Sequence, residues 1–222
     1  MTQNNLDLNP ANMDWLRGKD RSKVEFCKTL SRIGSPEFAI AAKKTRELAP
    51  YFVNLAPLIS FPNEFQRSID VLRKIIETEI GVEKFSRMAA ASTKVLPHLA
   101  VLTHILEIPM LFIKKSETKG RTRRIDGILY PGDKVLVIDD IISTGRTAIE
   151  ATEKLRAEGA LVENFVALLD NERGGRKRLK DNGLTLYTFI TIREVADYLE
   201  KMLIITTAQR KTIYDWVKKS GA

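Results

Sequence analysis

The sequence has one cysteine and no long hydrophobic run among its 222 residues. A single cysteine, Cys27, cannot close an internal disulfide, which excludes the disulfide framework of small secreted proteins. The longest apolar stretches, such as residues 96–102, are far shorter than the roughly 20 residues of a membrane-spanning helix. Residues 1–7 show no basic flank ahead of an apolar segment, as an export signal would require. We therefore expect a cytoplasmic protein without a membrane partner.

The sequence also lacks internal repeats and low-complexity segments. Hydrophobic residues make up 44% of the chain and charged residues 29%, which suffices for one hydrophobic core and excludes a disordered chain. Cys27 belongs to an apolar series at helical spacing with Val24, Leu30 and Ile33. We interpret it as buried packing in a single globular domain.

Acidic residues are outnumbered, with 28 Asp and Glu against 36 Lys and Arg, for a formal charge of +8. The excess favours anionic ligands such as nucleic acid, a membrane surface or phosphorylated substrates. Most of the cations alternate with acids on helical segments, which is typical of a solvated face. No helix-turn-helix module or aromatic-basic RNA motif is present, so we expect no nucleic-acid partner. Two stretches rich in lysine and arginine, 114–124 and 173–180, do not follow this alternation.

Single glycines and prolines separate short apolar runs. From residue 85 onward, these runs alternate between strand-like and helix-like patterns. The expected strands are 37–42, 51–55, 85–91, 110–114, 135–138, 162–169 and 185–190. The expected helices are 20–33, 62–81, 95–106, 144–158 and 172–182, followed by two closing helices, and 116–126 is expected to be a polar loop. Such alternation predicts an α/β fold with a central, mainly parallel sheet flanked by helices, in which ligands bind beyond the carboxyl ends of the strands.

The most informative segment is 134–149, where a β-branched strand leads into two adjacent carboxylates, Asp139 and Asp140. Two like charges in a partly buried place are costly unless something uses them. A ribose cis-diol is a fitting partner, because its two hydroxyls can each donate to a fixed carboxylate. The sequence therefore predicts a sugar-binding pair at the end of a central strand.

Hydroxyls and a permissive glycine follow at the start of the next helix, in Ser143, Thr144, Gly145, Arg146 and Thr147. A turn of this kind at a helix N-terminus forms a phosphate cradle. Each half has a purely structural alternative, because Asp-Asp occurs in strand-end turns and Ser or Thr caps helices. The combination is far more specific, and it is neither a Walker loop nor a dinucleotide fingerprint.

This combination resembles the phosphoribosyl-diphosphate (PRPP) binding motif of the type I phosphoribosyltransferases. The resemblance implies a single-domain phosphoribosyltransferase-like fold with a small N-terminal hood at about 35–60. We divide the chain into an N-terminal helical extension, 1–34, and a phosphoribosyltransferase domain, 35–222.

From about residue 30 to 200 the chain looks most like orotate phosphoribosyltransferases. Lys44 and the segment Ala-Pro-Tyr-Phe-Val-Asn at 49–54 resemble the family's orotate region. The resemblance implies that orotate is bound by Lys44, Phe52, Val53, Ser143 and Arg173.

Two further segments resemble the family's diphosphate-handling parts. Thr93 and Lys94, before Pro97, look like the pyrophosphate loop. Lys114, Lys115 and Lys119 look like the strand end and mobile lid, with the lid at 116–126. The resemblance implies PRPP contacts from all of these lysines and a catalytic role for Lys115 and Lys119.

The chain departs from the family pattern at two informative places. Val95 replaces the glycine that follows the pyrophosphate-loop lysine, and Asn171 replaces the arginine expected to touch the orotate ring. Arg173 could take over that contact only if the turn is displaced.

The activity implied is Mg²⁺-dependent transfer of the phosphoribosyl group from PRPP to orotate. No protein residue is expected to ligate Mg²⁺ directly, because the ion is bound mainly through PRPP near Asp139 and Asp140. A homodimer that shares its lids across the interface is also implied. Two alternatives stay open: a phosphoribosyltransferase for another base, and a non-catalytic PRPP or nucleotide sensor.

Overall fold

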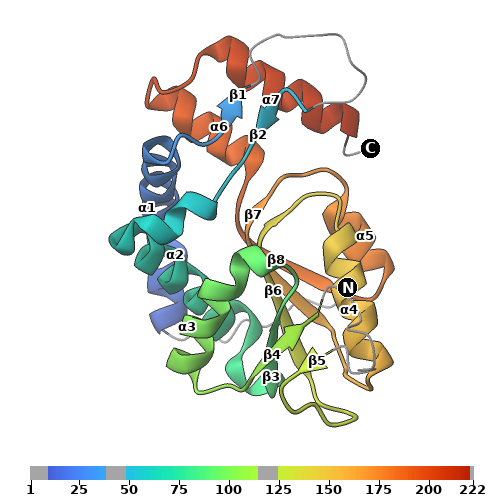
Figure 1. Cartoon of the computed structure of the whole chain (residues 1–222). Coiled ribbons are helices and arrows are strands. Elements are labelled where there is room, and N and C mark those ends of the chain that lie inside the picture. Colours follow the sequence, from blue (N-terminus) through green and yellow to red (C-terminus); the bar gives the residue numbers. More distant parts are fainter. Residues whose placement is uncertain (1–9, 39–48, 115–124, 221–222) are drawn as a thin grey trace.

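Short apolar strands and amphipathic helices alternate along the chain and build a six-stranded sheet with helices on both faces (Figure 1). The computed structural model describes residues 10–38, 49–114 and 125–220. The strand order is β5-β4-β3-β6-β7-β8, and only β5 runs antiparallel to its neighbour. The strands are β3 (Arg87–Ala90), β4 (Met110–Ile113), β5 (Ile125–Asp126), β6 (Val135–Ile142), β7 (Asn164–Asp170) and β8 (Thr185–Thr191). The prediction of a mainly parallel α/β sheet is confirmed.

The strand order reverses between β3 and β6. From β3 the chain continues to β4 on one side, and from β6 it continues to β7 on the other. The two strands pair in register, with Ala90 opposite Ile138. Because the crossover segments leave in opposite directions, a crevice opens beyond the carboxyl ends of these two strands, where doubly wound sheets bind ligands.

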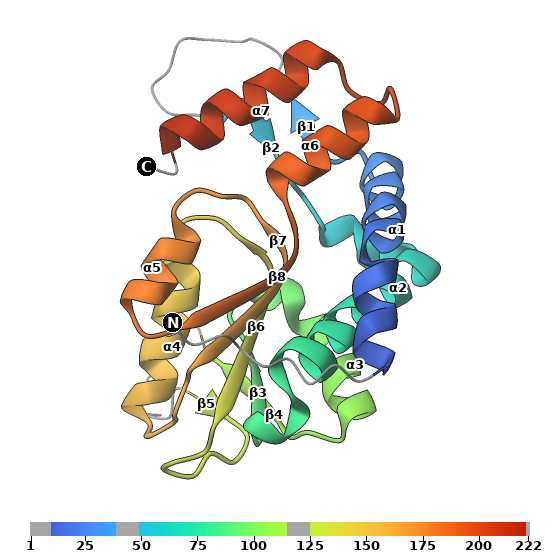
Figure 2. The ribbon, with the colours of Figure 1, turned by 180° about the vertical axis from the view of Figure 1, so that it is seen from behind.

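Helices α4 (Arg146–Ala157) and α5 (Gly175–Asp181) cover one face of the sheet, and α1 (Pro10–Arg32), α2 (Pro62–Ile75) and α3 (Leu96–Leu106) cover the other (Figure 2). A π-helical turn, Ile76–Ile80, continues α2, and short 3-10 turns lie at Ala56–Ser60, Val82–Lys84 and Thr93–Val95. None of the described helices has an apolar stretch long enough to cross a bilayer.

Strand β6 is buried on both faces, as its apolar sequence predicts. Leu136 and Ile138 pack in the core beneath α1, α2 and α3, whereas Val135 and Val137 pack in the core beneath α4 and α5. Since side chains alternate along a strand, Asp139 follows Val137 on one face and Asp140 follows Ile138 on the other.

Helix α1 is part of the main core. It begins at Pro10, ten residues before the expected start, and buries Cys27 and Leu30 completely. Its Trp15 ring stacks on Phe189 of β8 at 6.1 Å. The burial predicted for Cys27 is confirmed, and burial raises the pKa of its thiol to about 12. The segment that we treated as an N-terminal extension therefore contributes to the core.

Segments far apart in the sequence lie together above the sheet (Figure 1). Two short antiparallel strands, β1 (Glu37–Phe38) and β2 (Tyr51–Phe52), lie beside α6 (Ile192–Lys201) and α7 (Thr207–Ser220). We call these four elements the hood. The hood that the resemblance implies at about 35–60 is thus joined by the two closing helices.

Three element boundaries differ from the expectation, and each difference affects the site. Strand β6 continues to Ile142, so the carboxylate pair lies within the strand. Residues Ile125 and Asp126, expected in a polar loop, pair with β4 as β5. Helix α5 starts at Gly175 instead of 172, because Glu172 and Gly174 both have positive φ angles, which a helix does not accept.

Candidate active site

The carboxyl groups of Asp139 and Asp140 are held by short hydrogen bonds inside β6. Ser92, just after β3, donates its hydroxyl to Asp139 Oδ1 at 2.7 Å, and the Asp140 amide donates to the same oxygen at 3.0 Å. The Ile141 amide donates to Asp140 Oδ1 at 2.9 Å. Both aspartates are buried. The carboxylate pair therefore lies at the switch point between β3 and β6, fixed by neighbours on both strands.

Burial raises the pKa of the Asp139 carboxyl well above its ordinary value, and the negative charge of Asp140 raises it further. The hydrogen bond from Ser92 opposes this shift. A carboxyl in this state favours a partner that donates hydrogen bonds or carries positive charge. Ribose hydroxyls and a bound cation both meet that requirement.

A phosphate-sized hollow follows the pair at the N-terminus of α4. It has a volume of about 100 Å³ and is lined by Asp139, Phe165 and residues 141–148. No side chain caps α4, so the first amides of the helix have no capping partner. The Ser143 hydroxyl is also buried without a hydrogen-bond partner among the described residues. Unpartnered amides, a buried hydroxyl and the helix dipole together suit an anion.

The cradle needs glycine at two positions. Gly145 has φ +75°, and a Cβ there would lie 2.8 Å from Leu179 Cδ1. A Cβ on Gly175 would lie 2.4 Å from the Ser143 carbonyl oxygen, which accepts a hydrogen bond from the Gly175 amide at 2.9 Å. The turns before α4 and α5 therefore pack backbone against backbone.

The other predicted cradle residues lie on its rim. Thr144 and Thr147 are exposed at the cradle. The Arg146 guanidinium pairs with Glu150 at 2.9 Å on the surface of α4. The contribution of Arg146 that the structure supports is therefore its backbone amide in the first turn of the helix.

A second hollow of about 460 Å³ extends from the cradle toward β4. Its lining is Ala91, Ser92, Ile113, Lys114, Thr147, Glu150, Ala151 and Lys154. Lys114 pairs with Asp126 of β5 at 2.8 Å, and the Lys154 ammonium donates to the Lys114 carbonyl at 3.1 Å. Sequence reasoning missed Ser92 and Lys154, although Lys154 lies two helical turns after Thr147 and so on the same face of α4.

The predicted pyrophosphate segment lies between β3 and α3. Thr93 and Lys94 are exposed in the 3-10 turn that opens α3. Val95 is fully buried with φ −89° and ψ −2°, so this position needs no glycine conformation. The departure from the family pattern at Val95 is accommodated by an ordinary helical entry.

The predicted base-binding residues are only partly brought together. Phe52 is exposed on β2, whereas Val53 is buried in the core. The neighbouring Tyr51 donates its hydroxyl to Asn171 Oδ1 at 3.1 Å. Arg173 lies two residues beyond Asn171, beside the cradle. Three predicted residues, Lys44, Lys115 and Lys119, lie outside the described residues.

The carboxylate pair is also the place where a cation fits. Within the described ranges, no group of three or more His, Cys, Asp or Glu side chains is arranged to hold a metal ion. Mg²⁺ is commonly bound by one or two carboxylates together with substrate phosphates and water. The buried oxygens of Asp139 and Asp140 next to a phosphate cradle suit that mode.

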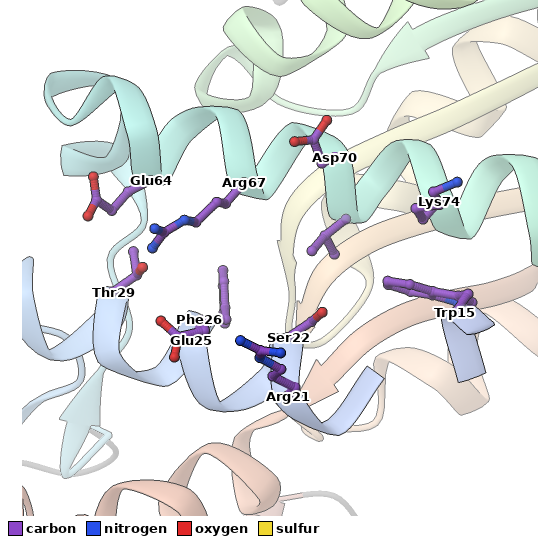
Figure 3. A pocket seen from close by; sticks show the side chains of 11 residues that line it. Trp15, Arg21, Ser22, Glu25, Phe26, Thr29, Glu64, Arg67, Asp70 and Lys74 are labelled. Atoms are coloured by element: carbon purple, nitrogen blue, oxygen red, sulfur yellow. The ribbon is translucent and has the colours of Figure 1, made fainter. Parts of the chain in front are cut away.

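A larger hollow of about 570 Å³ lies between α1 and α2, away from these residues (Figure 3). Arg21 and Glu25 of α1 face Glu64 and Arg67 of α2 across it, above the buried Phe26 ring. None of the cradle residues lines it. Its charges alternate in sign, so it is not a site for a strongly anionic ligand.

Comparison with known proteins agrees with this geometry. Residues 86–200 match the family described as phosphoribosyl transferase domain. The orotate phosphoribosyltransferase of Staphylococcus saprophyticus is 32% identical over 171 residues, covering 76% of this chain and 83% of that protein. The uridine 5′-monophosphate synthase of Bos taurus is 33% identical over 176 residues, covering 78% of this chain and 36% of that protein.

Among solved structures, the UMP synthase of Leishmania donovani superposes with a TM-score of 0.77 at 25% identity. The match covers 89% of this chain and 42% of that one. This chain thus spans less than half of the two synthases but most of the shorter transferase. The domain match covers more than half of the 222 residues and includes the carboxylate pair and the cradle. The chain therefore belongs to the type I phosphoribosyltransferase family.

Proposed function

We propose that this protein is an orotate phosphoribosyltransferase, a pentosyltransferase of pyrimidine biosynthesis. The observation that carries the proposal is the buried pair Asp139 and Asp140 beside an uncapped helix N-terminus at the switch point of the sheet. Three relatives are named orotate phosphoribosyltransferase, and each of them matches most of this chain. These relatives support orotate as the base.

In the reaction, a ring nitrogen of orotate attacks the anomeric carbon of PRPP. The bond from that carbon to the diphosphate oxygen breaks, the nitrogen loses its proton, and the products are orotidine 5′-monophosphate and pyrophosphate. No protein nucleophile is required. The protein contributes by holding both substrates in line and stabilising the charge that develops on the leaving group.

In this proposal, different residues of the described structure contact different parts of PRPP. The cradle at 143–147 binds the 5-phosphate through backbone amides and the Ser143 hydroxyl. Asp139 and Asp140 accept hydrogen bonds from the ribose hydroxyls and thereby fix the sugar ring. Thr93 and Lys94 lie beyond the end of β3, on the side where the diphosphate would extend.

Positive charge on the leaving side comes from lysines and from Mg²⁺. The ion, held mainly by the substrate near Asp139 and Asp140, would neutralise part of the diphosphate charge when bound. The family resemblance assigns Lys115 and Lys119 to the lid. In the proposed reaction, these two cations contact the departing pyrophosphate, and the lid excludes water.

The proposal also covers assembly and location. We infer a homodimer in which the lid of one subunit serves the site of its partner. We also infer a cytoplasmic enzyme, because a chain with a single cysteine lacks the internal disulfides that are typical of secreted proteins.

One observation favours a second candidate function. Asn171 stands where the resemblance implies an arginine that touches orotate, and without a cation from another residue the site favours a neutral base. A transferase for a neutral base would need no such cation.

A turnover assay with PRPP, Mg²⁺ and a panel of bases tests the proposal. Orotate, uracil, adenine, guanine and hypoxanthine are each supplied at saturation, and pyrophosphate release is followed. Orotate should give the highest kcat/KM of the panel. Faster turnover of another base would contradict the orotate assignment, and binding of PRPP without turnover of any base would identify a sensor.

A further inference from the structure

The segment after β7 is fastened to the cradle at both ends. The Asn171 amide donates to the Ile142 carbonyl at 2.7 Å, and the Gly175 amide donates to the Ser143 carbonyl at 2.9 Å. Residues 171–174 therefore form an arch directly beside the first residues of the phosphate cradle. Any side chain fixed on this arch is positioned relative to bound PRPP.

Asn171 is tied to the hood. Its Oδ1 accepts a hydrogen bond from the Tyr51 hydroxyl at 3.1 Å. Burial raises the pKa of Tyr51 to about 12, so this hydroxyl remains a neutral donor at physiological pH. The side chain of Asn171 is an uncharged amide and offers a ligand no positive charge. An anionic base in this site therefore needs its cation from another residue.

Arg173 is the residue of the arch that can supply this charge. Its guanidinium lies 5.3 Å from the ring centroid of Trp216 in α7. The neighbouring arginines are neutralised, because Arg176 pairs with Asp170 and Arg193 pairs with Glu172. Within the described part of the chain, Arg173 has no carboxylate partner, and its Nε is buried without a hydrogen bond.

The Trp216 side chain is partly buried. Its Nε1, like Nε of Arg173, is buried and has no hydrogen-bond partner among the described residues. Aromatic faces attract cations and hold a planar guanidinium parallel or oblique to the ring. The cation–π pair therefore holds two buried N–H groups, Arg173 Nε and Trp216 Nε1, that have no partner among the described residues.

We propose that Arg173 binds the carboxylate of the base and that Trp216 is the residue that positions it. This assignment rests on the proposed function. A guanidinium presents paired donors that match a carboxylate, which a neutral amide at 171 cannot do. Because Trp216 belongs to α7, the C-terminal helix becomes a determinant of base specificity.

The test separates positioning from structural support. Trp216→Leu removes the aromatic face, Trp216→Phe keeps it, and Arg173→Ala and Arg173→Lys remove the charge and the planar fork respectively. The matched control is Tyr214→Leu, because Tyr214 is on the same helix and lies under another arginine, Arg210, at 4.4 Å.

Arg173→Ala and Trp216→Leu should raise the KM for orotate by roughly tenfold or more, as expected for loss of a charge-assisted hydrogen bond. The affinity for PRPP, measured by calorimetry, should stay within about twofold of wild type because the cradle is intact. Trp216→Phe should restore most of the orotate affinity, and Tyr214→Leu should leave both constants unchanged. Preference for orotate over uracil should fall in Arg173→Ala.

Two results would overturn the assignment, and a third would overturn the proposed function on which it rests. Wild-type orotate KM in both Arg173→Ala and Trp216→Leu would show that the base is held by other groups. An equal loss of PRPP affinity in Trp216→Leu, together with a wild-type orotate KM in Arg173→Lys, would show that the pair supports the fold and does not select the base. A wild-type protein that turns over only another base would contradict the proposed function itself, whereas orotate turnover that is insensitive to Arg173 contradicts this inference alone.

Discussion

At the residue scale, the site depends on a pair of carboxyls placed where isolated acids are costly. Asp139 and Asp140 lie within a buried strand, and only short hydrogen bonds from Ser92 and backbone amides compensate them. A buried pair of carboxyls lowers the free energy of unfolding of the ligand-free protein, but it offers strong hydrogen-bond acceptors to a bound ligand. Binding and stability should therefore respond in opposite directions when the charges are removed.

The double variant Asp139→Asn with Asp140→Asn should bind PRPP at least roughly a hundredfold more weakly, because it loses two charge-assisted hydrogen bonds. Its fold should persist, since neither carboxyl packs a core. Calorimetric titration with PRPP and Mg²⁺ measures the affinity. The matched control, Asp181→Asn with Asp215→Asn, removes two exposed carboxylates that pair with lysines. Wild-type affinity in the first variant would refute the sugar-binding assignment.

The raised pKa of Asp139 also predicts how stability depends on pH. Because burial makes the folded state hold the proton more tightly than the unfolded state, the free energy of unfolding falls as pH rises above the ordinary aspartate range. Asp139→Asn removes this fall in the free energy of unfolding, because asparagine does not titrate. Urea unfolding should show the variant gaining on wild type as pH rises toward neutrality, with the two converging in acid. A stability difference that does not change with pH would argue against a perturbed carboxyl.

At the element scale, the site is made where turns after three parallel strands meet. The turn after β3 supplies Ser92, the turn after β6 supplies the cradle, and the arch after β7 is bonded to Ile142 and Ser143. Gly145 and Gly175 allow the last two turns to touch. The cradle should therefore be sensitive to any added side chain at this contact.

Gly145→Ala should lower the free energy of unfolding by about 1–3 kcal/mol through a positive φ angle and a clash with Leu179. It should also weaken PRPP binding, because the first turn of α4 must move. Gly183→Ala is the control, since Gly183 has a similar φ of +71° but open space around its Cα. The control should lose stability without losing PRPP affinity. Equal binding in both variants would show that the close contact between the turns is unimportant.

Local patterns predicted the sheet, the helices on its faces and the positions of the carboxylate pair and of the turn before α4. The strand at 135–138 and the cradle at 143–147 could be identified because a buried parallel strand and a phosphate-binding turn have local sequence requirements. The extension of β6 to Ile142 could not be predicted, because it depends on pairing with β7, where Ile142 lies opposite Asp170.

The base half was harder to predict for the same reason. The contact of Tyr51 with Asn171 joins residues 120 positions apart, and the stacking of Arg173 on Trp216 involves the C-terminal helix. Neither residue pair has a local pattern. The sequence indicated that the arginine at 171 was absent, but it did not indicate which side chain lies beside the replacement.

At the scale of the whole molecule, segments far apart in the sequence come together above the site. The hood combines β1 and β2 from the N-terminal part with α6 and α7 from the C-terminal part. Tyr51 and Trp216 both reach the arch from the hood. Under the proposed function, base recognition would therefore be coupled to the position of the hood, whereas PRPP binding would depend on the sheet.

The proposed dimer makes a separate prediction at this scale. Lys119→Ala should lower kcat by about a hundredfold with a much smaller effect on PRPP affinity, since it acts on the leaving group in the transition state. Mixed with the Asp139→Asn, Asp140→Asn protein, it should regain activity if lids are shared, because one site of each mixed dimer is complete. Native mass spectrometry verifies subunit exchange. No recovery after exchange would mean that each subunit uses its own lid.

The stoichiometry of turnover tests the central claim most directly. With PRPP and Mg²⁺ in excess, the loss of orotate and the release of pyrophosphate are measured in the same sample, in wild type and in the Asp139→Asn, Asp140→Asn variant. An orotate phosphoribosyltransferase consumes one orotate for each pyrophosphate released, and the variant should do neither. Pyrophosphate release without orotate loss, or equal turnover by the variant, would contradict the account.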